Sequence, residues 1–236
     1  ITWGQFNTLA NQMAHQLKQL GVKKGDVVAI MMDNRIENLA AITGLVKLGA
    51  AASMLNTHLT DHPLVRCITS IGSKKIIVGE ELVDPINAIR KDLPFRDKTD
   101  FLFVRDQGKA SCPDWATECR PDDHSKHNLP ETQHIQLKDL AYYIFTSGTT
   151  GLPKASVITH DRHYRMSLGF GSIALDMQPT DRIYVCLPLY HSSAMFIGFG
   201  SITFAGASMF LRRKFSASNL LDEARQHNTN CFAYIG

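Results

Sequence analysis

The stretch Tyr143-Ile-Phe-Thr146-Ser147-Gly148-Thr149-Thr150-Gly151-Leu152-Pro153-Lys154 changes character along its length. The apolar run 141–145, which overlaps its start, predicts a buried strand. The second half is a run of hydroxyls and glycines closed by a lysine. Glycines let backbone N–H groups converge on an anion, hydroxyls add donors, and the lysine adds a mobile positive charge. The pattern predicts a loop that binds a triphosphate, against the alternative of a polar surface turn.

The spacing of this loop excludes one well-known phosphate loop and resembles another. A Walker loop requires G-x-x-x-x-G-K-[ST], whereas here Leu152 and Pro153 separate Gly151 from Lys154. The whole pattern, Tyr-x-x-Thr-Ser-Gly-Thr-Thr-Gly-x-Pro-Lys, resembles the phosphate loop of the AMP-forming acyl-CoA synthetases. That superfamily also contains luciferases and the adenylation domains of peptide synthetases.

Segments elsewhere in the chain extend this resemblance. Three of them look like the fatty-acid transport protein and very-long-chain acyl-CoA synthetase branch: His160-Asp-Arg-His-Tyr-Arg-Met166, Cys186-Leu-Pro-Leu-Tyr-His-Ser-Ser-Ala194 and Arg213-Lys-Phe-Ser-Ala-Ser218. Segments 1–6 and 45–50 look like the first two motifs of the family, so the resemblance covers almost the whole chain. Because the chain starts inside a motif and lacks an initiator Met, we expect an N-terminal fragment of a longer protein.

Composition sets the class of protein. The chain has 236 residues, of which 44% are hydrophobic, enough for one or two domains with a sizeable core. The net charge is +3 with scattered Lys and Arg, which does not indicate nucleic-acid binding. Five cysteines without paired short spacing indicate the reduced thiols of a cytoplasmic protein: Cys67, Cys112, Cys119, Cys186 and Cys231. The resemblance leaves open a peripheral association with the inner face of a membrane, and a homo-oligomer.

Alternating apolar patterns predict an α/β fold of βαβ units with mostly parallel sheets. Strands are expected at 27–32, 51–55, 75–78 and 100–104, and helices at 6–20, 34–49, 60–71 and 81–91. Thr2 with Gln5, Asn34 with Glu37, and Ser218 are the expected helix caps.

The resemblance implies two lobes of the large N-terminal domain of an adenylate-forming enzyme, truncated. Residues 1–106 are expected to form the first lobe and 107–138 a surface excursion that joins it to the second. Residues 139–236 would form the second, incomplete lobe with the phosphate loop. The small C-terminal domain is expected to be absent.

Two segments admit a second interpretation. His124, His127 and His134 suggest a metal site, but no second ligand cluster has suitable spacing, which favours solvated loop histidines. The stretch 183–211 carries no Lys, Arg, Asp or Glu and has roughly the length of a membrane span. Pro188, His191 and a serine pair interrupt it, which favours a buried strand, loop, helix and strand.

The resemblance implies a two-step reaction that uses ATP, Mg²⁺ and coenzyme A. A fatty-acid carboxylate attacks the α-phosphate of ATP to give an acyl-adenylate and pyrophosphate, and the thiol of coenzyme A then displaces AMP. By resemblance, Thr146 is the catalytic hydroxyl nearest Mg²⁺ and Lys154 is the catalytic cation. The residues implied to bind the β- and γ-phosphates are Ser147, Gly148, Thr149, Thr150, Gly151 and Lys154.

His191 and Met195 are the candidate acid-binding residues. His191 ends Leu-Pro-Leu-Tyr-His, which looks like the acyl-pocket motif of the family, where a catalytic histidine lies against the carboxylate or adenylate. Met195 follows four residues later, where some long-chain relatives carry a tryptophan gate, and a flexible thioether suits a sliding acyl chain. The alternatives are a hydrogen-bonded core histidine and a core-filling methionine.

Together these features predict a fatty acyl-CoA synthetase for long- or very-long-chain acids. The adenine motif, the magnesium-binding glutamate, the ribose-binding aspartate, the hinge and the catalytic lysine of the family are expected beyond Gly236. We therefore expect the fragment alone to be inactive. The alternatives are a ligase for another acid, such as an aryl or carnitine-like acid, and a non-catalytic lipid-binding or transport module.

Overall fold

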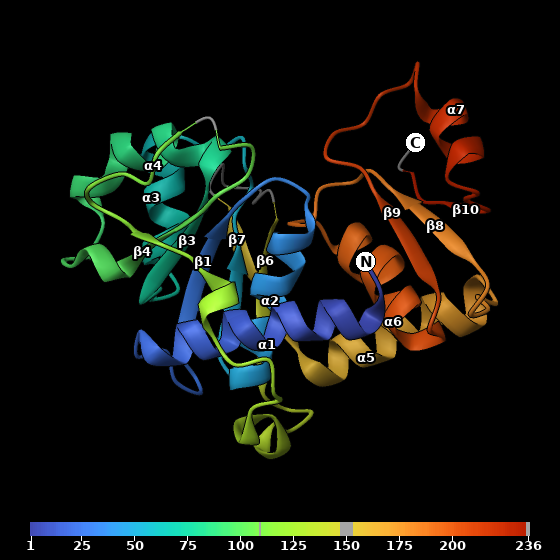
Figure 1. Ribbon diagram of the computed structural model, residues 1–236, viewed down its shortest axis with the longest axis horizontal. Helices are drawn as coiled ribbons and strands as arrows, with labels where there is room; N and C mark the ends of the chain where they lie inside the picture. Colours follow the sequence, from blue (N-terminus) through green and yellow to red (C-terminus); the bar gives the residue numbers. More distant parts are fainter. Residues whose placement is uncertain (109, 147–152, 235–236) are drawn as a thin grey trace. The chain divides into compact units, whose positions relative to one another are not determined.

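A computed structural model describes residues 1–108, 110–146 and 153–234, and the chain separates into two units. The first unit is Ile1–Thr159 and the second is His160–Gly236, and each is described by itself (Figure 1). All five cysteines are free thiols, as the sequence predicted.

The first unit is built on a seven-stranded sheet in the order β5-β4-β3-β1-β2-β6-β7. The strands are β1 Val27–Met31, β2 Ala51–Met54, β3 Lys75–Gly79, β4 Phe101–Val104, β5 Thr117–Glu118, β6 Leu140–Thr146 and β7 Lys154–Thr159. Every neighbouring pair is parallel except β6 and β7, which are antiparallel. The predicted α/β class with mostly parallel sheets is confirmed.

Helices cover both faces of this sheet, as right-handed crossovers require (Figure 1). They are α1 Trp3–Gln19, α2 Ile36–Leu48, α3 Asp61–Thr69 and α4 Val83–Ile89, with short 3₁₀ turns η1 Glu80–Leu82, η2 Arg90–Asp92, η3 Lys98–Asp100, η4 Pro121–Asp123 and η5 Pro130–His134. The capping box of Thr2 and Gln5 is confirmed at α1. Gly49 ends α2 at φ 73°, a left-handed conformation that glycine adopts without strain.

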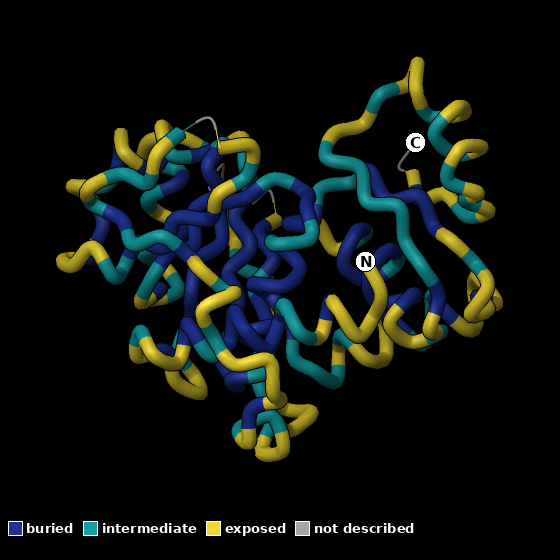
Figure 2. The backbone as a smooth tube through the Cα atoms, in the orientation of Figure 1, coloured by how far each residue is buried: buried dark blue, intermediate teal, exposed yellow. Residues whose placement is uncertain are grey.

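The middle strand β1 is buried along its whole length, as its continuously apolar sequence requires (Figure 2). One core cluster joins Ala29 and Met31 of β1 to apolar residues of β3, α3, α4 and β4. At the crossing of α1 and α2, a Cβ on Gly44 would lie 3.1 Å from backbone atoms of Ala10 and Ala14. The two helices therefore pack closely because this position has no side chain.

Two of the predicted helix caps are wrong. The residue before α2 is Arg35, in extended conformation and without a side-chain cap, rather than Asn34. The last helix, α7 Leu220–Gln226, follows Asn219 and also lacks a side-chain cap, so Ser218 does not cap it. Both helices have an acidic residue in the first turn, which stabilises a helix N-terminus without a cap.

The segment 107–138 differs from a linker between lobes. Its β5 extends the sheet beside β4, and the residues that follow lie along α1. Asn11 Nδ2 donates to the Lys126 carbonyl at 2.8 Å, and the Gln16 side chain receives the Arg120 N–H at 3.0 Å. These amides are buried in a helix, and the backbone of this segment supplies their partners.

The division of the chain follows from the same sheet. The sequence predicted a break on either side of 107–138, whereas the structure places it between Thr159 and His160. The reason is that β6 pairs with β2 and β7 pairs with β6, so both strands belong to the first sheet.

The second unit has a three-stranded parallel sheet in the order β10-β8-β9. Its elements are α5 His160–Leu168, the π-helix η6 Gly169–Ala174, β8 Arg182–Val185, the π-helix η7 Ser193–Gly200, α6 Ser201–Ala205, β9 Ser208–Leu211, α7 and β10 Cys231–Phe232. The uncharged stretch 183–211 forms the predicted strand, loop, helix and strand. Among the described residues, no helix combines the length and apolarity needed to span a membrane.

Candidate functional site

Thr146 and Lys154 face each other at the end of the β6–β7 hairpin. They are the last register pair of the two strands, and Thr146 Oγ1 lies 3.4 Å from the Lys154 carbonyl oxygen, to which it donates. Both residues are exposed, whereas Ile144 and Phe145 just before them are buried. The largely buried β6 thus brings the Thr146 hydroxyl to the surface, where it lies opposite Lys154 at the start of β7.

This pair lies where open α/β sheets bind ligands. Since β6 is parallel to β2 and to the other strands before it, Thr146 stands at the carboxyl edge of the sheet. Within the part of the chain that the structure describes, no hydrogen bond or ion pair involves the Lys154 ammonium. Ser147, Gly148, Thr149, Thr150 and Gly151 lie outside the described residues.

A buried arginine, which the sequence analysis missed, ties together the loops at this edge. Arg35 is 7% exposed, and its side chain donates to the Arg105 carbonyl at 2.8 Å and the Val104 carbonyl at 3.0 Å. It also pairs with Glu81 at 3.4 Å. These contacts join the segments after β1, β3 and β4. The sequence signal that could have identified Arg35 is a single arginine between the apolar strand β1 and the apolar helix α2.

His191 follows β8 in a turn of the second unit. Its N–H donates to the Pro188 carbonyl at 2.9 Å, and its ring lies 4.6 Å from the Tyr190 ring, centroid to centroid. The residue is exposed overall, but partial desolvation of the ring lowers its pKa. A histidine of this kind is neutral near pH 7, so one ring nitrogen accepts and the other donates.

Met195 is 1% exposed and lies in the first turn of η7. Its N–H donates to the His191 carbonyl at 3.3 Å, which links the two candidate acid-binding residues. This burial is expected of a methionine that fills the core, and it is equally compatible with a methionine that lines an acyl-chain pocket.

Glycines hold η7 tightly against its neighbours. A Cβ on Gly200 would overlap Ser167 Oγ of α5 and lie 3.0 Å from the Met195 carbonyl oxygen. A Cβ on Gly198 would lie 2.9 Å from a methyl carbon of Val185 in β8. Such contacts leave no room for a side chain, so these glycines position Met195. π-Helical turns of this kind are frequent at functional sites.

The four described candidates form two pairs. The structure brings Thr146 and Lys154 together in the first unit and His191 and Met195 together in the second. Within the described ranges, no group of three or more His, Cys, Asp and Glu side chains is placed to hold a metal ion. A magnesium ion bound mainly through phosphate oxygens and water needs few protein ligands, and an exposed Thr146 hydroxyl fits that role.

A parallel α/β sheet with this hairpin at its carboxyl edge defines the fold of the large domain of adenylate-forming enzymes. The crystal structure of the anthranilate-CoA ligase AuaEII in complex with anthranoyl-AMP superposes with a TM-score of 0.83 at 24% identity, over 97% of this chain and 43% of that one. The chain belongs to the AMP-binding enzyme family, whose model matches residues 1–235.

Curated relatives place the chain within this family. It is 37% identical over 245 residues to human long-chain fatty acid transport protein 1. It is 36% identical over 236 residues to the medium/long-chain-fatty-acid–CoA ligase FadD6 of Mycobacterium tuberculosis. Both alignments use 100% of this chain but only 36% and 38% of the relatives. The chain therefore spans a little over a third of their length.

Proposed function

We propose that the full-length protein is an AMP-forming fatty acyl-CoA synthetase for long- or very-long-chain acids. The observation that carries this proposal is the exposed Thr146–Lys154 pair at the carboxyl edge of a sheet of this family. The names of the relatives, a fatty acid transport protein and a fatty-acid–CoA ligase, support the class of acid. Long alkyl chains and the adenosine part of ATP would be bound with the help of residues beyond the chain described here.

Lys154 is proposed to offset the negative charge of the ATP phosphates during adenylation. A carboxylate that approaches a polyphosphate is repelled, and the leaving pyrophosphate gains negative charge. A lysine free of other partners among the described residues offsets both effects without first breaking an ion pair. When bound, ATP would supply the adenylyl group and the leaving pyrophosphate, Mg²⁺ would neutralise phosphate charge, and coenzyme A would supply the thiol.

Thr146 is proposed to orient the metal-bound phosphates through its hydroxyl, and Ser147 to Gly151 to bind the β- and γ-phosphates. His191 is proposed to hydrogen-bond the acid carboxylate or the adenylate, since a neutral ring can donate without a competing charge. Met195 is proposed to lie beside the acyl chain.

The test is ATP–pyrophosphate exchange by the full-length protein, screened over acids from short to very long and including aryl acids and carnitine-like acids. We expect exchange that rises with chain length. If exchange requires an aryl or carnitine-like acid, the protein is still an AMP-forming acid–CoA ligase, but its substrate is not a fatty acid. Tight binding of long-chain acids without exchange would instead favour a lipid-binding or transport module, which the name of one relative makes the second candidate.

A further inference from the structure

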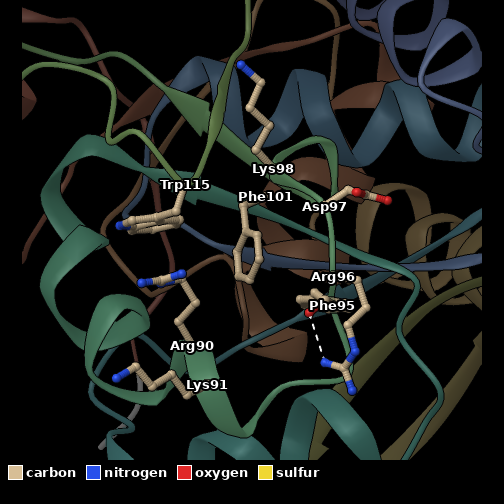
Figure 3. A pocket seen from close by; sticks show the side chains of 8 residues that line it. All are labelled: Arg90, Lys91, Phe95, Arg96, Asp97, Lys98, Phe101 and Trp115. Atoms are coloured by element: carbon tan, nitrogen blue, oxygen red, sulfur yellow. Dashed lines mark hydrogen bonds between the residues drawn. The ribbon is translucent and has the colours of Figure 1, made fainter.

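A pocket with a positively charged lining lies in the first unit, away from the hairpin (Figure 3). It encloses ≈ 360 Å³ and is lined by Arg90, Lys91, Phe95, Arg96, Asp97, Lys98, Phe101 and Trp115. Lys98 and Phe101 stand at the amino end of β4, and Trp115 precedes β5. Because β4 and β5 run parallel to β6, this is the sheet edge opposite Thr146.

The charges of this pocket come from two separate segments. Arg90 and Lys91 follow α4, and a helix C-terminus favours cations, so these two alone would not mark a site. Arg96 and Lys98, however, belong to the segment that leads into β4. Asp97 is the single acidic residue in the lining. Four cationic residues and one carboxylate thus line one pocket.

The Arg90 guanidinium is held in place by aromatic rings. Its Cζ lies 5.5 Å from the centroid of Trp115, and Figure 3 shows the guanidinium alongside that ring. Trp115 meets Phe101 edge-on at 5.2 Å, and Phe101 meets Phe95 edge-on at 5.3 Å. Stacking occupies the face of a guanidinium and leaves its N–H groups, which lie in the plane, able to bind an anion.

Those donors have no acceptor within the described part of the chain. Arg90 Nε is buried there without a hydrogen-bond partner, and Arg90 forms no ion pair. Arg96 differs, since its guanidinium donates to the Leu93 carbonyl at 3.2 Å and the Phe95 carbonyl at 3.1 Å. The two Nη groups of the half-buried Arg90 likewise have no hydrogen-bond partner among the described residues, so they are the donors available to an anion in this pocket. Arg90 is therefore the candidate anion-binding residue of this pocket.

We propose that this pocket binds a phosphate-bearing anion, with Arg90 as the bidentate receptor and Lys91 and Lys98 as further cations. A phosphate monoester carries close to two negative charges and matches the fork of a guanidinium. The volume is at the small end of ligand pockets, which fits a phosphate with a small organic body. The same group occurs on free phosphorylated metabolites and on the headgroups of lipids such as phosphatidic acid. The pocket is independent of the proposed reaction, because Lys154 lies at the other edge.

The first experiment is a calorimetric titration of the full-length protein with glycerol phosphate. Arg90→Gln and Lys98→Gln should each weaken binding roughly tenfold or more. Arg90→Lys should weaken it too, because it keeps the charge but loses the fork. The matched control is Lys138→Gln, which removes one exposed positive charge of the same unit outside the pocket and should change nothing. ATP–pyrophosphate exchange should be unchanged in all of them, and Lys154→Ala should retain the binding.

The second arm separates the two sources of the phosphate. Vesicles of phosphatidylcholine, with and without phosphatidic acid, are floated with the protein and the same variants. Pocket-dependent flotation with phosphatidic acid and no glycerol phosphate binding identifies a lipid headgroup, and the reverse identifies a free ligand. Binding of neither probe, or equal weakening by Lys138→Gln, overturns the proposal. If Arg90→Gln does not fold, as judged by circular dichroism, the exposed Lys98→Gln decides.

Discussion

The β6–β7 hairpin and the helix η7 present their candidate residues in opposite ways. Thr146 is exposed at the end of the largely buried β6, and Lys154 is exposed at the start of β7, in which only Ile158 is buried. Met195 is buried within a helix that two glycines pack against α5 and β8. An exposed cation would act on the phosphates of ATP, which are the same whichever acid is bound. A tightly packed segment would instead be sensitive to the size and shape of the acid bound beside it. The comparison predicts general losses from the hairpin and selective or structural losses from η7.

The largest effect is expected from the hairpin. Lys154→Ala should lower adenylation about 10²-fold for short and long acids alike, because it removes a preorganised charge donor. ATP–pyrophosphate exchange in the full-length protein is the measurement, with Lys138→Ala as an exposed lysine control. Unchanged exchange would remove Lys154 from the mechanism, and a loss confined to long acids would break the comparison.

A loss of folding stability is expected when a glycine of η7 is replaced. Gly200→Ala places a Cβ against Ser167 Oγ and the Met195 carbonyl, and overpacking of this kind costs about 1–3 kcal/mol. Gly169→Ala is the matched control in the same unit, because nothing lies within 4 Å of its added Cβ. Urea unfolding should show the first variant destabilised and the second near wild type. Equal stability of the two would mean that η7 is not tightly packed.

Acid should weaken the second unit through a histidine of α5. Desolvation, together with the nearby His160, lowers the pKa of His163 to about 4. The unfolded chain takes up a proton near the ordinary pKa of 6.5, while the folded form does not until about 4. Stability is therefore complete above about pH 6.5 and falls as the pH drops toward 4, by on the order of 1–3 kcal/mol.

His163→Gln should flatten this acid dependence. Hydrogen exchange followed by mass spectrometry at pH 7 and pH 5 reports the two units separately. We expect protection in 160–234 to decline with acid in the wild type and less so in the variant. The same decline in both proteins would assign the acid sensitivity to other groups.

The smallest effect is expected from the acyl side of η7. Met195→Trp should reduce exchange with long acids several-fold and leave short acids tolerated, because the bulkier indole would shorten the proposed acyl-chain site. His191→Ala should instead impair every acid, since it would act on the carboxylate that all acids share. Rates measured across chain length separate the two patterns. Equal losses across chain length for Met195→Trp would indicate a core position.

The sequence by itself determined the local elements and the position of the phosphate motif. The apolar run of β1, the capping box of Thr2 and Gln5, and the change from apolar residues to hydroxyls after Phe145 all depend on neighbours a few residues away. Such short-range patterns also made Thr146 and Lys154 recognisable as candidates.

Tertiary structure alone decided how these elements combine. The antiparallel pairing of β7 with β6 and the division of the chain after Thr159 are both features of the tertiary structure. So are the contacts by which Arg35, the residue before α2, joins three loops. The Asn11–Lys126 hydrogen bond spans 115 residues, and Arg90 meets Trp115 only because both reach the same edge of the sheet. Contacts this distant depend on strand order and packing, which no local pattern encodes.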